Sequence, residues 1–137
     1  MKPRKLKVVV VDDSLVVRQR LAALIAVIPG IELAGEAGSV TEALMLIRNC
    51  KPEAVILDLH LEGGNGFDVL RQAKREVVAP VVIMLTNFPS GRARQACIEH
   101  GGDFFFDKST EFESALEVLT ALESKWRKAV VTTRIEL

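Results

Sequence analysis

The chain has 137 residues, of which 49% are hydrophobic and 26% are charged, a composition typical of one globular domain rather than of a disordered chain. Its 18 basic and 18 acidic residues cancel, so the net charge offers no general attraction to nucleic acid or to an anionic membrane. Two cysteines do not indicate a disulfide scaffold, and no apolar run is long enough for a membrane span or a secretory signal. We therefore expect a soluble, cytoplasmic, single-domain protein.

Short apolar segments rich in β-branched or aromatic residues recur along the chain and predict strands. In chain order they are residues 6–11, 32–36, 54–57, 81–85 and 104–106. Three of them are almost wholly apolar, which is typical of strands covered on both faces of a parallel sheet.

A helical pattern follows each predicted strand. The helix starts are marked, in chain order, by Ser14, the capping box Ser39-x-x-Glu42, the glycine-containing loop 62–66, Ser90 and the capping box Thr110-x-x-Glu113. Five strand–helix units predict an α/β fold in which right-handed crossovers build a doubly wound, five-stranded parallel sheet with helices on both faces. We expect this domain to cover residues 1–124, with residues 125–137 as a helix extension or tail and no output domain.

Polar residues stand where the predicted strands end. Asp12 and Asp13 follow the first strand, Asp58 follows the third, Thr86 follows the fourth, and Lys108 comes after the fifth. Because ligands of open parallel sheets bind beyond the carboxyl ends of the strands, we expect these side chains to converge at one edge.

The converging groups indicate phosphoryl chemistry. Three neighbouring carboxylates repel one another unless a cation joins them, and hard oxygen ligands without a Cys or His cluster suit Mg²⁺. Asp58, between the other two acids and the cation, is then a candidate carboxylate nucleophile toward phosphorus. Lys108 would bind one phosphoryl oxygen, and the Thr86 hydroxyl would donate a hydrogen bond to another.

These strand-end residues, together with the loop Gly63-Gly64-Asn65-Gly66, resemble the response-regulator receiver domain of bacterial two-component signalling over residues 6–124. The resemblance implies a flavodoxin-like fold with strand order 2-1-3-4-5. It implies that Asp58 accepts a phosphoryl group from the phospho-His of a histidine kinase or a histidine phosphotransfer protein. Such a domain catalyses only its own phosphorylation and dephosphorylation, so it is a signalling module rather than an enzyme.

The same resemblance implies the remaining site residues. Asp12, Asp13, Asp58 and the backbone carbonyl of His60 would bind Mg²⁺, and Thr86 with Phe105 would form the switch. The fourth helix, fifth strand and fifth helix would then form a surface for a downstream protein or for self-association. No direct contact with nucleic acid or membrane is expected from this domain.

Three features depart from the family pattern. Ser109 follows Lys108, where the family usually has proline in a cis peptide, and the switch aromatic is Phe105, which lacks the hydroxyl of the common tyrosine. The variable positions beside the phosphorylation site are His60 and Phe88, whose side chains can alter the access of water to an aspartyl phosphate.

Three alternatives match part of the same pattern. A haloacid-dehalogenase-type phosphatase needs aspartates at positions i and i+2 after the first strand, whereas Asp12 and Asp13 are adjacent. A flavodoxin-like cofactor binder needs a Ser/Thr/Gly phosphate loop there. The third is a receiver cut from a DNA-binding regulator, because Asp13-Ser14, Arg18 and residues 34–37 resemble receivers joined to helix-turn-helix output domains.

Overall fold

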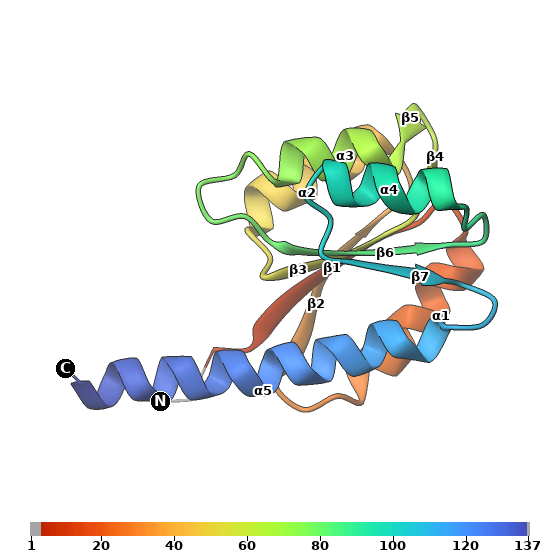
Figure 1. Ribbon diagram of the computed structural model, residues 1–137. Coiled ribbons are helices and arrows are strands. Elements are labelled where there is room, and N and C mark those ends of the chain that lie inside the picture. The colour runs from red at the N-terminus through yellow and green to blue at the C-terminus, as the bar shows by residue number, and fades with distance from the viewer. Residues whose placement is uncertain (1–3, 137) are drawn as a thin grey trace.

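A five-stranded parallel sheet forms the centre of the protein. The computed structural model describes residues 4–136, with side chains as far as residue 129. The strands are β1 (Leu6–Val11), β2 (Ile31–Ala37), β3 (Ala54–Leu57), β6 (Val81–Thr86) and β7 (Phe104–Asp107). Their order in the sheet is β2-β1-β3-β6-β7, which confirms the predicted doubly wound arrangement (Figure 1).

Five helices connect and cover these strands. They are α1 (Leu15–Ala26), α2 (Val40–Cys50), α3 (Gly66–Ala73), α4 (Gly91–Glu99) and α5 (Phe112–Glu136). Ser14, Ser39 and Ser90 cap α1, α2 and α4 as predicted, since each side chain accepts a hydrogen bond from the backbone N–H three residues later. In the described part of the chain, no helix combines the length and apolar character that a membrane span requires.

The loop after β3 holds a small hairpin that the sequence did not predict. Strands β4 (His60–Leu61) and β5 (Gly64–Asn65) pair in the antiparallel direction, with Gly63 in the turn and Gly64 at the start of β5 both at positive φ. Asn65 then caps α3 in a capping box with Asp68. Two-residue strands carry too little periodic pattern to be recognised in a sequence.

The start of α5 differs from the expected capping box of Thr110 and Glu113, because the helix begins at Phe112, one residue later. Glu111 is held in the turn that ends β7: its N–H donates to the Asp107 carbonyl, at 2.7 Å, and its carboxylate accepts from the Asp107 N–H. At its other end α5 continues to Glu136, so residues 125–136 extend the helix.

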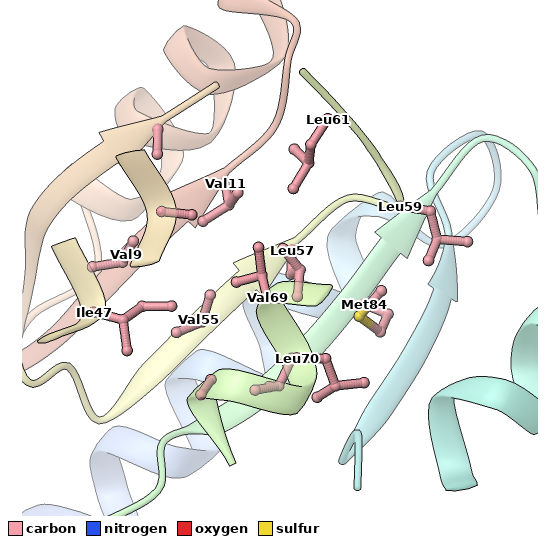
Figure 2. Close-up of a cluster of buried hydrophobic side chains, with 14 of the residues drawn as sticks. Val9, Val11, Ile47, Val55, Leu57, Leu59, Leu61, Val69, Leu70 and Met84 are labelled. Carbon is pink, nitrogen blue, oxygen red and sulfur yellow. The ribbon is translucent and has the colours of Figure 1, made fainter. Parts of the chain in front are cut away.

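Two hydrophobic layers enclose the sheet. Alternate residues of each central strand point to opposite faces, where α2, α3 and α4 cover one side and α1 and α5 cover the other (Figure 1). Figure 2 shows the first layer, in which these labelled side chains meet: Val9, Val11, Ile47, Val55, Leu57, Leu59, Leu61, Val69, Leu70 and Met84. The close packing makes the sheet a rigid support for the groups at its carboxyl edge.

Candidate functional site

The strand registers bring the predicted site residues to one edge of the sheet. Val11 pairs with Leu57 in adjacent strands, so the residues that follow them, Asp12 and Asp58, emerge side by side. One carboxylate oxygen from each of Asp12, Asp13 and Asp58 lies within 4.8 Å of the others.

Lys108 enters this cluster from the turn after β7. Its Nζ lies 2.6 Å from Asp12 Oδ2 and 3.2 Å from Asp58 Oδ2, and its side chain is only 8% exposed. The Lys108 backbone N–H donates to the Thr86 carbonyl, at 2.8 Å, which fixes the turn against β6. The Lys108–Ser109 peptide is trans, because the described chain has no cis bond. One ammonium group thus joins two buried carboxylates from different strands.

The three carboxylates differ in the partners already available to them. The second oxygen of Asp12 accepts from the Ser14 N–H at 2.9 Å, and that of Asp58 accepts from the Leu59 N–H at 2.8 Å. Asp13 is exposed, and within residues 4–136 its carboxylate makes no hydrogen bond or ion pair. Asp13 is therefore the carboxylate with the most capacity left for a ligand.

Burial and neighbouring charges shift the pKa values of Asp58 and Lys108, both upward. Burial is the largest influence on the pKa of Asp58 and raises it above the ordinary value; Lys108 opposes this effect, and Asp12 adds to it. Burial disfavours the charged form of Lys108, but the hydrogen bonds and charges of Asp12 and Asp58 outweigh it and raise the pKa of Lys108. Three carboxylates share the site with this one ammonium group, so it holds more negative charge than the ammonium group can balance.

The donor set fits a hard divalent cation. Carboxylate oxygens converge within 4.8 Å without a Cys or His among the clustered ligand atoms, and an oxygen-only set of this kind is typical of Mg²⁺. A cation there would also relieve the repulsion between Asp12, Asp13 and Asp58.

Gly66, at the start of α3, allows the backbone to pass Asp58 closely. A Cβ atom on this residue would lie 2.2 Å from the Asp58 carbonyl oxygen, so no side chain fits there. The Gly66 N–H donates to the Leu59 carbonyl at 2.8 Å. The glycine thereby ties the loop after Asp58 to α3.

The two expected switch residues are both buried. Thr86 is fully buried, and its hydroxyl oxygen accepts a hydrogen bond from the Phe88 N–H at 3.1 Å. Phe105 is 7% exposed and packs in the layer under α4, the inward position expected for a ring without a hydroxyl. The guanidinium of Arg94, in α4, lies 4.7 Å from the centre of the Phe105 ring.

Two aromatic side chains, those of His60 and Phe88, lie beside Asp13 at the exposed side of the carboxylate cluster. The rings of His60 and Phe88 meet edge to face, with their centroids 4.5 Å apart, and both side chains are exposed. They line a shallow cavity of about 450 Å³ together with Asp13. His60 and Phe88, the two variable positions noted in the sequence, are therefore in direct contact beside this cavity.

Arg18 is a supporting residue whose contacts the sequence did not reveal. Its guanidinium donates to the Asp12 carbonyl at 2.6 Å and lies 3.4 Å from the Glu36 carboxylate. Arg18 thus links α1 and β2 to the turn that carries the two aspartates. The helical pattern of α1 gave no signal for this contact, which depends on how α1 crosses the sheet.

Comparisons of the whole chain with known proteins identify its family. A family model described as the response regulator receiver domain matches residues 8–120. The transcriptional regulatory protein LiaR of Bacillus subtilis (strain 168) is 30% identical over 128 residues, which are 91% of this chain and 61% of LiaR. A protein-glutamate methylesterase/protein-glutamine glutaminase of Pyrococcus horikoshii is 35% identical over 106 residues, which are 77% of this chain and 29% of that protein.

Solved structures agree with the family match. A two-component response regulator of the LuxR family from Aurantimonas sp. SI85-9A1 has a TM-score of 0.80 and 25% identity, with 88% of this chain and 86% of that chain covered. The response regulator domain of Thermotoga maritima CheB shares the fold, with a TM-score of 0.76 and 23% identity over 89% of this chain and 96% of that one. The chain spans between 29% and 61% of the length of the two curated relatives above. With its fold, its strand-end residues and the match over residues 8–120, the chain belongs to the response regulator receiver domain family of two-component systems.

Proposed function

We propose that this chain is a phosphoryl-accepting receiver in which Asp58 is the acceptor. The donor would be the phospho-His of a histidine kinase or a histidine phosphotransfer protein, and the compartment would be the cytoplasm. The observation that carries the proposal is the buried Asp58 carboxylate, 3.2 Å from Lys108 and clustered with Asp12 and Asp13.

The chemistry follows from these groups. An Asp58 carboxylate oxygen forms the new O–P bond while the N–P bond of the donor breaks, and the leaving imidazole keeps the electron pair. Lys108 would bind an oxygen of the transferred group, and Thr86 would donate its hydroxyl to another. Asp12, Asp13, Asp58 and the His60 carbonyl would hold Mg²⁺, which when bound neutralises charge on carboxylate and phosphoryl oxygens.

The direct test uses acetyl phosphate, a small phosphoryl donor, with the intact chain. In the presence of Mg²⁺ we expect one acid-stable, hydroxylamine-sensitive phosphoryl group per chain, located at Asp58 by peptide mass spectrometry. Without Mg²⁺ the labelling should fall to background. A phosphoryl group found at any other residue would contradict the assignment of Asp58.

Replacing Asp13 with Ala should remove most of the Mg²⁺ affinity of the site. Asp13 is exposed and has no partner in the described part of the chain, so its oxygens are the ones free to bind a cation. The same change removes one of three mutually repelling charges, so the variant without metal should be as stable as the wild type or more stable. NMR titration with Mg²⁺ measures the affinity, and an unchanged dissociation constant would refute this role.

Replacing His60 with Ala should speed the loss of the phosphoryl group by roughly severalfold. The imidazole packs against Phe88 over the rim of the cavity that contains Asp13, so its removal opens a path for water toward Asp58. The half-life of the phosphorylated protein measures the effect, with Glu62→Ala as an exposed control in the same loop. Equal half-lives for wild type and His60→Ala would leave His60 without influence on hydrolysis.

The proposed output surface comprises α4, β7 and α5. When Thr86 turns toward a phosphoryl oxygen on Asp58, its bond to the Phe88 N–H is lost and the start of α4 is released. Arg94 and Phe105 link that helix to β7, so a shift should spread along this surface. Phosphorylation would thus favour a conformation of this surface that the unphosphorylated protein already populates.

The coupling is measured by NMR with and without beryllofluoride, a phosphoryl analogue. We expect chemical-shift changes around Asp58 and also throughout residues 87–106. Changes confined to the acidic pocket would show that the α4, β7 and α5 surface does not respond.

A second candidate is the receiver part of a DNA-binding regulator. LiaR is a transcriptional regulatory protein, and this chain corresponds to 61% of its length. The Aurantimonas neighbour is a two-component response regulator of the LuxR family. The sequence of the complete gene tests this alternative, since a helix-turn-helix segment after α5 would establish it.

A further inference from the structure

An apolar groove lies at the edge of the sheet opposite to Asp58. Its lining includes the residues at which β1 and β6 begin, Leu6 and Val81, so it is located at the amino ends of the strands. One wall is α5 beyond residue 121, and the other is the loop between α3 and β6. Figure 1 shows both elements projecting on the same side of the domain. We call this cavity of about 880 Å³ the basal groove.

The walls of the basal groove expose apolar side chains that nothing in the described domain covers. Val77 and Val78, in the α3–β6 loop, are fully and 86% exposed, and they stand opposite Leu122 and Trp126 of α5. Adjacent apolar side chains gathered around a groove are typical of a binding site rather than of solvent-facing surface. Tryptophan is also among the residues that contribute most to binding at protein interfaces.

The charges along the groove are predominantly positive. Arg48, Lys51 and Lys125 line it, and within the described residues none of the three forms an ion pair. Of the two acidic lining residues, Glu53 is already engaged by Arg4 at 2.7 Å and by the Lys7 N–H at 2.6 Å. Glu76 is the other. The groove therefore presents an excess of positive charge around an apolar floor.

Lys51 has an unfavourable backbone conformation at this site. It follows the last residue of α2 with φ of 50°, and among the described residues it is the only one besides glycine in the left-handed region. Glycine is the residue that normally occupies this place at a helix end, because it lacks a Cβ. A lysine here keeps a positive charge on the groove at a cost to the fold, and strain of this kind is commonly retained at functional positions.

We propose that the basal groove docks an amphipathic helical segment of another protein, with carboxylates beside the apolar face of that segment. The apolar face would lie on Trp126 and Val77, and the carboxylates would meet Arg48, Lys51 and Lys125. Because the groove is at the opposite edge from Asp58, the docked segment would leave the phosphorylation site open. The basal groove would thus hold a partner independently of phosphorylation.

The chain supplies its own reporter for this interaction. Trp126 is the only tryptophan and the chain contains no tyrosine, so tryptophan fluorescence reports the basal groove alone. The probe is a peptide of about 14 residues, roughly four helical turns, with leucine along one face and glutamate on both flanks of that face. A second peptide has lysine in place of every glutamate. The unphosphorylated chain is used without Mg²⁺, so the result does not depend on the chemistry of Asp58.

We expect the acidic peptide to change Trp126 emission saturably and the lysine peptide to bind about tenfold more weakly. Val77→Asp, which places a carboxylate on the apolar wall, should abolish binding of the acidic peptide. Lys51→Gly should weaken it about threefold, as expected for one exposed ion pair. Because glycine relieves the left-handed backbone, Lys51→Gly should melt no lower than the wild type, so lost affinity cannot be attributed to unfolding. Arg92→Gln removes a positive charge outside the groove and should leave the affinity unchanged.

Several results would overturn the proposal. The first is equal affinity for the acidic and the lysine peptide, and the second is that neither peptide changes the emission of Trp126. The third is that Lys51→Gly and Val77→Asp both bind the acidic peptide as tightly as the wild type does. Sedimentation of the chain alone tests whether a second copy of the chain occupies the groove. A dimer that Val77→Asp dissociates would assign the groove to a second copy of this chain in place of another protein.

Discussion

Replacing Asp58 with Asn is expected to reduce phosphorylation by acetyl phosphate by more than about a thousandfold, because the nucleophile itself is removed. The amide keeps the size of the carboxylate and an oxygen that can accept the Leu59 N–H, so the loop should stay in place. Phosphoryl incorporation measured by mass spectrometry checks this result. Asp68→Asn, which changes a partly exposed aspartate in the first turn of α3, is the matched control and should label as the wild type does.

The same substitution should change how stability depends on pH. The pKa of Asp58 is raised in the folded protein, mainly by burial, so the folded state binds more protons than the unfolded state above pH 3.8, the ordinary value. Stability contributed by this group is therefore present at lower pH and is lost as the pH rises through its folded pKa.

In buffer without Mg²⁺, Asp58→Asn should consequently be more stable than the wild type at neutral pH. The difference between the two proteins should shrink as the pH falls toward 3.8. Urea unfolding over that range measures the difference. A difference that grows toward low pH would contradict the raised pKa of Asp58.

Replacing Lys108 with Met is expected to lower the free energy of unfolding by about 3 kcal/mol at neutral pH without Mg²⁺, because two buried carboxylates lose their common counterion. Asp12 and Asp58 are 2% and 5% exposed, and Lys108 lies within 3.2 Å of both. Methionine retains most of the apolar stem, so the loss reflects charge rather than packing. Lys5→Met changes an exposed lysine and should alter stability by less than about 0.5 kcal/mol.

Millimolar Mg²⁺ should restore much of the stability that Lys108→Met loses. A divalent cation among the carboxylates supplies the positive charge that the ammonium group had provided. Phosphorylation should stay slow in the same variant, because Lys108 would also bind the transferred group. Equal destabilisation with and without Mg²⁺ would show that the three carboxylates do not form a cation site.

Much of the fold and the site composition was determined by local sequence patterns. Apolar segments of strand length, followed by capped helical patterns, were enough to predict a parallel sheet with helices on both faces. Polar residues directly after those segments predicted which side chains meet, because the carboxyl ends of parallel strands share one edge. Asp12, Asp58 and Lys108 lie together for this reason. The pairing of Val11 with Leu57 places Asp12 directly beside Asp58.

Other features arise only from the packing of distant segments. Arg18 reaches the Asp12 carbonyl because α1 crosses β1 and β2, and Arg94 lies over Phe105 because α4 crosses β7. The basal groove forms because the extended α5 lies beside the α3–β6 loop. Nothing in the sequence of either segment indicates that the two are neighbours. Local sequence therefore determined the elements and the residues at their ends, whereas the tertiary structure determined the contacts between side chains far apart in the chain. The physical reason is that caps and periodicity depend on neighbouring residues, while these contacts depend on how whole elements pack.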